Sequence, residues 1–174
     1  MSPRWGGWRR DGIPDDVRAA IGGRERLLAW AQDPRTGSRI VAGSWRLYAV
    51  APDTAAGAAA GRPWHLVDAG VWDPTQGTLK VTWVDRAPAL TATIVEQNGL
   101  PETLRERVQA SVVLADFLEL GERRTARVVV RRNLETGDLL AQTILGPGVS
   151  SADPHVLAVT TGALARLREQ VGLE

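Results

Sequence analysis

The chain has 174 residues, enough for one domain with a substantial core, and contains no cysteine, which excludes disulfides, thiolate metal sites and a cysteine nucleophile. Its net charge of +1 predicts no bulk attraction to nucleic acid or to membranes. No apolar run approaches the roughly 20 residues of a membrane span, and no apolar stretch follows the basic residues 1–10. We therefore expect no secretory signal and a cytoplasmic protein.

Residues 1–23 are predicted to form a tail and a short helix ahead of the main domain. Trp5 and Trp8 stand in the tail among glycines and arginines, a composition too rich in glycine for a stable element. Pro14 is well placed to begin a helix that Gly22 ends. Because an exposed indole is costly, we expect Trp5 and Trp8 to dock on the rest of the chain, the commoner case, or on another molecule.

Three loops, at residues 33–37, 73–77 and 133–137, share one design and each separates two apolar runs. Each begins with Asp or Asn, which opens a type I turn by accepting backbone hydrogen bonds. Each ends with Gly, which supplies the left-handed conformation at the exit of a bulged hairpin. Three such hairpins predict an antiparallel β protein.

The remaining elements follow from the apolar pattern between these loops. The Ala- and Gly-rich residues 51–62 are predicted to be a flexible loop, and residues 101–108 a short polar helix. Asp153 as N-cap and Gly172 as terminator bound a closing helix with one apolar stripe, to which we assign Leu157. Strands are expected over about residues 25–32, 39–50, 64–72, 78–85, 111–120, 125–132 and 139–145, with a further extended segment at 90–95.

These elements predict a mainly β, α+β protein with a single domain over residues 24–174. We expect either two packed antiparallel sheets or a barrel of about seven to eight strands, with the C-terminal helix capping it. The core is predicted to contain Leu28, Trp30, Ile40, Trp45, Leu47, Trp72, Leu79, Val81, Trp83, Phe117, Val128, Val130, Leu164 and Leu167.

The order of four strands, a connector, three strands and a helix resembles the pleckstrin-homology-like barrel over residues 24–172. Pleckstrin-like domains bind proteins, peptides or lipid headgroups, and the fold does not fix which. In its motifs the chain also resembles a group of uncharacterised proteins from high-GC bacteria. That resemblance implies no activity, catalytic residue or cofactor, and it lies in residues 26–31, 63–73, 105–114 and 126–132.

The chain offers little catalytic chemistry. His65 and His155 lack the spacing of metal ligands, and no serine stands in a nucleophile elbow. Glu102 and Glu106 lie one helical turn apart, but arginines interleave them, which is more typical of a solvated helix face than of an acid/base pair. We favour a non-catalytic protein that uses no cofactor or metal, and keep an enzyme as an alternative.

One cluster of arginines is a candidate binding site. Arg127 and Arg131 fall on the same face of a predicted strand, with Arg124 beside them and Arg105 on the preceding connector. Guanidinium groups side by side on a sheet suit an anion or an acidic peptide. The alternative is a solvated face whose arginines pair with acidic residues of neighbouring strands. Those acidic residues are Glu119, Glu122, Glu135 and Asp138.

We interpret the chain as a non-catalytic binding or adaptor domain for a protein or peptide. The candidate binding residues are Arg127, Arg131, Arg124, Arg105, Trp5 and Trp8. One alternative is a small-molecule-binding barrel or enzyme with a Trp-lined cavity. Another is a binder of anionic surfaces through the arginine-rich face, either lipid headgroups or nucleic acid, of which nucleic acid is the less expected. The sequence does not indicate an oligomeric state.

Overall fold

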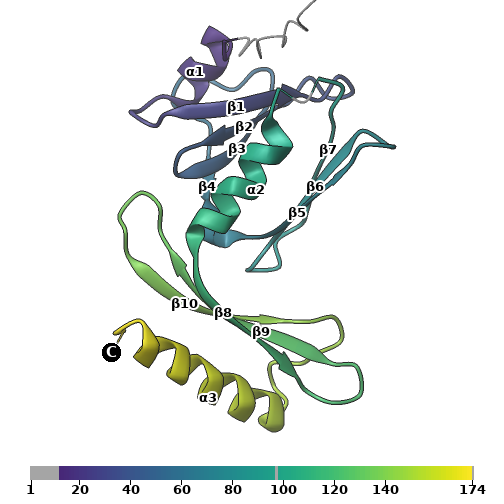
Figure 1. The fold of residues 1–174 in the computed structure, drawn as a ribbon. Helices are drawn as coiled ribbons and strands as arrows, with labels where there is room; N and C mark the ends of the chain where they lie inside the picture. Colours follow the sequence, from purple (N-terminus) through teal and green to yellow (C-terminus); the bar gives the residue numbers. More distant parts are fainter. Residues whose placement is uncertain (1–11, 97, 174) are drawn as a thin grey trace, which may run out of the picture.

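A computed structural model describes residues 12–96 and 98–173, which form an upper part (residues 12–111) and a lower part (residues 112–173) (Figure 1). The helices are α1 (Asp15–Ile21), α2 (Leu100–Ser111), α3 (Pro154–Gln170) and the short 3-10 helix η1 (Trp64–Leu66). The strands are β1 (Leu27–Gln32), β2 (Arg39–Gly43), β3 (Arg46–Val50), β4 (Gly61–Pro63), β5 (Val67–Asp73), β6 (Thr78–Trp83), β7 (Leu90–Thr93), β8 (Val112–Glu119), β9 (Thr125–Arg132) and β10 (Leu139–Leu145).

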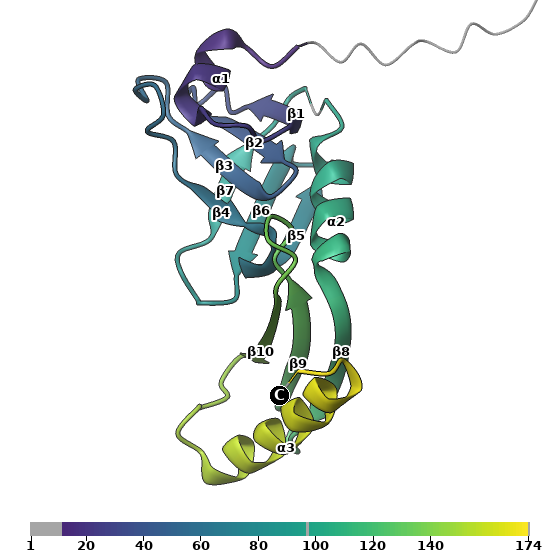
Figure 2. The same ribbon diagram turned by 90° about the vertical axis from the view of Figure 1, so that its left-hand side faces the viewer.

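Within the described residues the strands form three antiparallel sheets, in the orders β1-β2-β3-β4, β5-β6-β7 and β10-β9-β8. The first two face each other in the upper part, and α2 lies along one side between them (Figures 1 and 2). The third sheet forms the lower part with α3. The predicted mainly β, α+β class is therefore confirmed. The barrel alternative is wrong, because β1 and β5 are outer strands of separate sheets and do not pair with each other.

The three loops that begin with Asp or Asn and end with Gly form hairpins, as predicted. They join β1 to β2, β5 to β6 and β9 to β10. In the first, the Asp33 carboxylate accepts a hydrogen bond from the Arg35 amide at 2.8 Å, and Gly37 has a φ of 73°. In the third, the Asn133 side chain accepts from the Glu135 amide at 3.0 Å, and Gly137 has a φ of 84°. Both turns thus use the side-chain acceptor and left-handed glycine that the sequence indicated.

The predicted strand over residues 39–50 is in fact two strands, because Glu25 turns the chain between them. Its carboxylate accepts hydrogen bonds from the Trp45 and Arg46 amides at 2.5 and 2.8 Å, and from the Tyr48 hydroxyl. Burial and this contact raise the pKa of Tyr48. A Cβ at Gly43 would lie 2.2 Å from Glu25 Oε1, so only glycine leaves room for the carboxylate.

Two segments before β5 also differ from the prediction. The Ala- and Gly-rich loop is bonded to α1: the Gly57 and Ala59 amides donate to the Ala19 and Ala20 carbonyls at 2.9 and 3.0 Å. It leads into β4, which the sequence did not predict, and the expected strand over residues 64–72 begins instead as η1. Here Trp64 is fully buried, and its Nε1 donates to the Gly43 carbonyl at 3.0 Å.

Most of the predicted core is buried, with one clear exception. Ile40, Leu47, Leu79, Val81 and Trp83 are buried in the upper part, and Val128, Val130 and Leu167 in the lower part. Leu28, Trp30, Trp45, Trp72 and Leu164 are partly buried. The prediction for Phe117 is wrong, since this side chain is 75% exposed.

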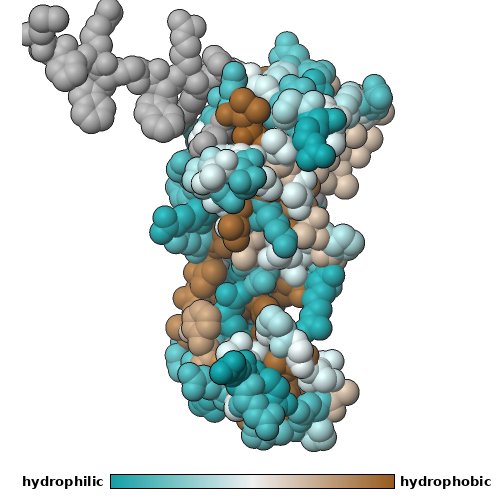
Figure 3. All heavy atoms as spheres, turned by 90° about the vertical axis from the view of Figure 1, so that its right-hand side faces the viewer, coloured by the Kyte–Doolittle hydropathy of each residue, from teal (hydrophilic) through white to brown (hydrophobic). Residues whose placement is uncertain are grey.

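The exposure of Phe117 follows from strand alternation. Leu114 and Leu118 on β8 pack against α3, so Phe117 points to the opposite face of the sheet. Val112 and Val113, also on β8, are exposed as well. Figure 3 shows apolar surface, in brown, at the level at which the upper and lower parts meet.

The C-terminal helix begins as predicted. The Asp153 carboxylate caps α3 by accepting a hydrogen bond from the His155 amide at 2.9 Å. Val156, Ala163 and Leu167 are buried, whereas Leu157, assigned to the apolar stripe, is 59% exposed. In the described part of the chain, none of the helices has both the length and the apolarity that crossing a membrane requires.

Two grooves beside helix α2

Helix α2 is the element that shapes the surface of the upper part. Gly99, with a φ of 72°, starts it, and Pro101 occupies its first turn. Leu100 and Leu104 are buried in the core between the two upper sheets. The helix thus lies between the outer strands β1 and β5 (Figures 1 and 2). The residues that line two hollows show that a groove runs along each side of α2.

The first groove, here called the β5 groove, is a mainly apolar hollow of about 430 Å³ between β5 and α2. The walls pair the partly buried Trp72 of β5 with Leu104 and Val108 of α2. Polar side chains stand at its rim. The full lining is Ala69, Gly70, Trp72, Pro101, Glu102, Leu104, Arg105, Val108 and Gln109.

Gly70 sets how closely α2 approaches β5. A Cβ at this position would lie 2.1 Å from Leu104 Cδ2, far inside van der Waals contact. Gly70 itself is exposed, as are its neighbours Ala69 and Val71, the latter by 60%. Because β5 pairs with β6 on one side alone, alternate backbone amides and carbonyls of β5 point away from the sheet along this groove.

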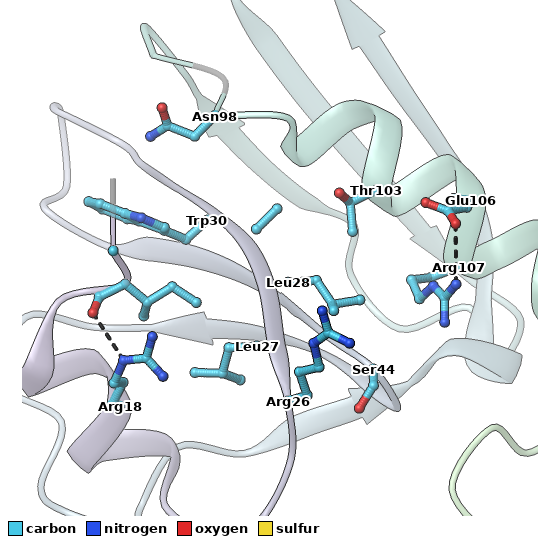
Figure 4. A pocket seen from close by; sticks show the side chains of 13 residues that line it. Arg18, Arg26, Leu27, Leu28, Trp30, Ser44, Asn98, Thr103, Glu106 and Arg107 are labelled. Atoms are coloured by element: carbon cyan, nitrogen blue, oxygen red, sulfur yellow. Dashed lines mark hydrogen bonds and ion pairs between the residues drawn. The ribbon is translucent and has the colours of Figure 1, made fainter. Parts of the chain in front are cut away.

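The second groove, the β1 groove, has a volume of about 480 Å³ and lies between β1 and the other side of α2 (Figure 4). Three arginines and one glutamate supply its charge. Its lining is Gly12, Ile13, Arg18, Arg26, Leu27, Leu28, Ala29, Trp30, Ser44, Asn98, Thr103, Glu106 and Arg107. The two grooves therefore differ in chemistry: one is mainly apolar and the other is basic.

The predicted arginine pair does lie on one face of β9, but both members are engaged inside the protein. Arg127 forms an ion pair with Asp68. Arg131 is 2% exposed, and its Nη1 donates to Ser111 Oγ at 2.9 Å and to the Trp64 carbonyl at 3.4 Å. Burial lowers the pKa of Arg131 to about 10. These two arginines join the lower sheet to the upper part and offer no free cationic face.

The other candidate residues do not gather around that pair. Arg124 forms an ion pair with Asp153 at 3.0 Å, beside the start of α3. Arg105 is exposed on α2 and lines the β5 groove. Trp5 and Trp8 lie outside the described residues. Of the acidic partners weighed for the arginine face, Glu135 pairs instead with Arg46 at 2.5 Å.

One sequence signal would have placed Arg105 and Arg107 on different sides of α2. Arg105 and Arg107 are two residues apart on a helix, which places them about 200° apart around its axis. They therefore line opposite grooves, although they read as a single basic cluster in the sequence. The contribution of β1 and β5 could not be inferred, because it depends on which strands end each sheet.

The described residues that line the two grooves include no histidine. No group of three potential metal ligands occurs among the residues that the structure describes. His65 is buried near Arg131, and burial, with that positive charge, lowers its pKa.

A scan against protein-family models, a search of curated proteins and a search of solved structures each find no match to this chain.

Proposed function

We propose that this protein is a non-catalytic binding module that holds an extended segment of a partner protein in the β5 groove. The proposal rests on one observation: in this groove the outer strand β5 lies beside an apolar wall. A strand edge offers backbone hydrogen bonds to any extended peptide, and pockets beside it select among side chains.

The lining indicates which peptide would fit. Trp72, Leu104 and Val108 give an apolar surface for one aliphatic or aromatic side chain. Arg105 and Glu102 at the rim offer one charge of each sign, so polar residues would flank the anchor. We therefore expect a short extended motif with a central apolar residue.

The order of elements supports the same class of function. The order expected from the sequence over residues 24–172, four strands, a connector, three strands and a helix, resembles pleckstrin-homology-like domains. Because such domains bind proteins and peptides among other ligands, the resemblance favours a binding module without identifying the partner. The absence of cysteine fits a reducing compartment, and we place this function in the cytoplasm.

The test is selection of a displayed random-peptide library against the whole chain. We expect enriched peptides to perturb the backbone amides of Ala69, Gly70 and Trp72 in NMR spectra, and to bind Val108→Glu at least tenfold more weakly. Arg107→Ala, on the other side of the same helix, is the matched control and should bind normally.

Two outcomes would overturn the proposal: selected peptides that bind Val108→Glu as well as they bind the wild type, or amide perturbations that map away from β5 and α2. The NMR map keeps the test decisive if Val108→Glu fails to fold, because it needs only the wild-type chain.

A further inference from the structure

The β1 groove brings three arginines together in one hollow, although other exposed arginines, such as Arg35 and Arg86, also form no ion pair with a described residue. Elsewhere, five arginines each form an ion pair with a carboxylate from a distant part of the chain. These pairs are Arg39–Asp16, Arg46–Glu135, Arg62–Asp85, Arg124–Asp153 and Arg127–Asp68. In the β1 groove three arginines meet one glutamate, so positive charge remains in excess there.

The contacts of these three arginines leave most of their donors uncommitted. Arg18 Nε donates to the Ile13 carbonyl at 3.2 Å. Arg107 contacts Glu106, its exposed neighbour in sequence, at a long 3.4 Å, and its buried Nε has no acceptor within the described chain. The Arg26 side chain forms no ion pair with any described residue. Guanidinium donors held this way suit a phosphate or carboxylate, whose oxygens accept in pairs.

Figure 4 shows that the groove is bounded on both sides by such groups. Arg26 enters from the strand side and Arg107 from α2, with Leu28 between them. An anion placed between the two walls would therefore meet donors from both. The two cations come from separate elements, Arg26 from the residue before β1 and Arg107 from α2.

The rest of the lining is suited to an apolar body attached to that anion. Leu27, Leu28 and Trp30 line the groove together with the arginines, so its lining includes a flat aromatic side chain as well as aliphatic ones. Asn98 and Thr103 add neutral polar groups. The volume of about 480 Å³ lies within the range of small-molecule sites.

We infer that the β1 groove binds an organic anion that carries a phosphate or carboxylate on a flat apolar group. The same anion chemistry could be presented free in solution or on a lipid headgroup, and the experiment separates these sources.

The test is calorimetric titration of the whole chain with 1-naphthyl phosphate, 1-naphthoate and inorganic phosphate, each at low and high salt. We expect a naphthyl anion to bind at least tenfold more tightly than inorganic phosphate, and less tightly at high salt. Binding should weaken at least tenfold in Arg26→Ala and in Arg107→Ala. Arg105→Ala, on the opposite side of α2, should bind normally.

Vesicles with and without phosphatidylserine form the second arm. Binding to anionic vesicles that is lost in Arg26→Ala would identify a headgroup as the source, in support of the inference. Vesicle binding without any binding of the free probes, probe binding that Arg26→Ala leaves unchanged, or no binding by any probe would overturn it. Arg26 is exposed, so this variant tests the groove without removing a core contact.

An acidic peptide that competes for Arg26 and Arg107 while neither naphthyl anion binds would also overturn the inference, since it would assign the groove to a macromolecule. The β5 groove is unaffected by Arg26→Ala, so this result stands apart from the peptide-binding proposal.

Discussion

Replacement of Gly70 by alanine tests whether α2 is seated on β5 as closely as the structure places it. The added Cβ would lie 2.1 Å from Leu104 Cδ2 and 3.4 and 3.6 Å from Cγ and Cδ1. Carbon atoms pack best at about 3.5–4.0 Å, so the methyl end of Leu104 must move by well over 1 Å. Leu104 is only 2% exposed and packs in the core, so it can shift only toward the β5 groove that it lines.

Overpacking of this kind costs about 1–3 kcal/mol. For a chain of this length, each kcal/mol lowers the melting temperature by about 2–4 °C, so Gly70→Ala should melt about 2–12 °C below the wild type. Urea denaturation should show a lower midpoint with an unchanged slope. Gly12→Ala is the matched control, because a Cβ there meets no atom of the described residues within 4 Å.

A double-mutant cycle ties the cost to Leu104. Leu104→Ala alone should cost about 2–5 kcal/mol, because it leaves a cavity in the core. In the double variant the methyl group introduced in place of Gly70 partly occupies that cavity, so the two costs should fall short of additivity by about 0.5–3 kcal/mol. The reasoning would be refuted if Gly70→Ala were more stable than the wild type, which is expected if its only effect is to stiffen the unfolded chain. It would also be refuted if the free-energy costs of the two substitutions were strictly additive.

Three further outcomes are expected. Gly162 lies inside α3, where an added Cβ would meet only the guanidinium group of Arg166, 3.9 Å away. Gly162→Ala should therefore raise the free energy of unfolding by about 0.5–1 kcal/mol in urea titrations, and a lower value would contradict this packing. Glu25→Ala removes a carboxylate that accepts from two backbone amides and from Tyr48, and should cost at least about 1.5–3 kcal/mol in the same assay, against no change if these bonds are replaced by water. Because burial lowers the pKa of His65 below its ordinary 6.5, the unfolded chain takes up the proton more readily, and stability should fall as pH drops below about 6.5. His65→Gln should flatten that part of the pH dependence of thermal unfolding, and an equal slope in the variant would argue against it.

The sequence predicted best those elements that are set by local chemistry. β9 and β10 have the predicted bounds of residues 125–132 and 139–145, because a strong turn separates two clear apolar alternations. Asp153 caps α3 as expected, since an N-cap acts on residues immediately beside it. In each case the information lies within a few residues of the element.

The failures involve contacts between residues far apart in the chain. The division of residues 39–50 into two strands depends on Glu25, which lies about 20 residues away. Phe117 has the hydrophobicity of a core residue, but its exposure depends on which face of the sheet α3 covers. The pairing of Arg127 with Asp68 depends on the docking of the lower sheet under β5, which no local pattern reveals.

The joint between the upper and lower parts has a consequence for the length of the chain. Ser111 ends α2 and Val112 begins β8, so no loop residue separates helix from strand. One inserted residue would have nowhere to be absorbed: either Leu114 and Leu118 would turn out to solvent, or α2 would rotate by about 100° out of both grooves. The joint is therefore sensitive to its length, and a tag or reporter insertion does not belong here.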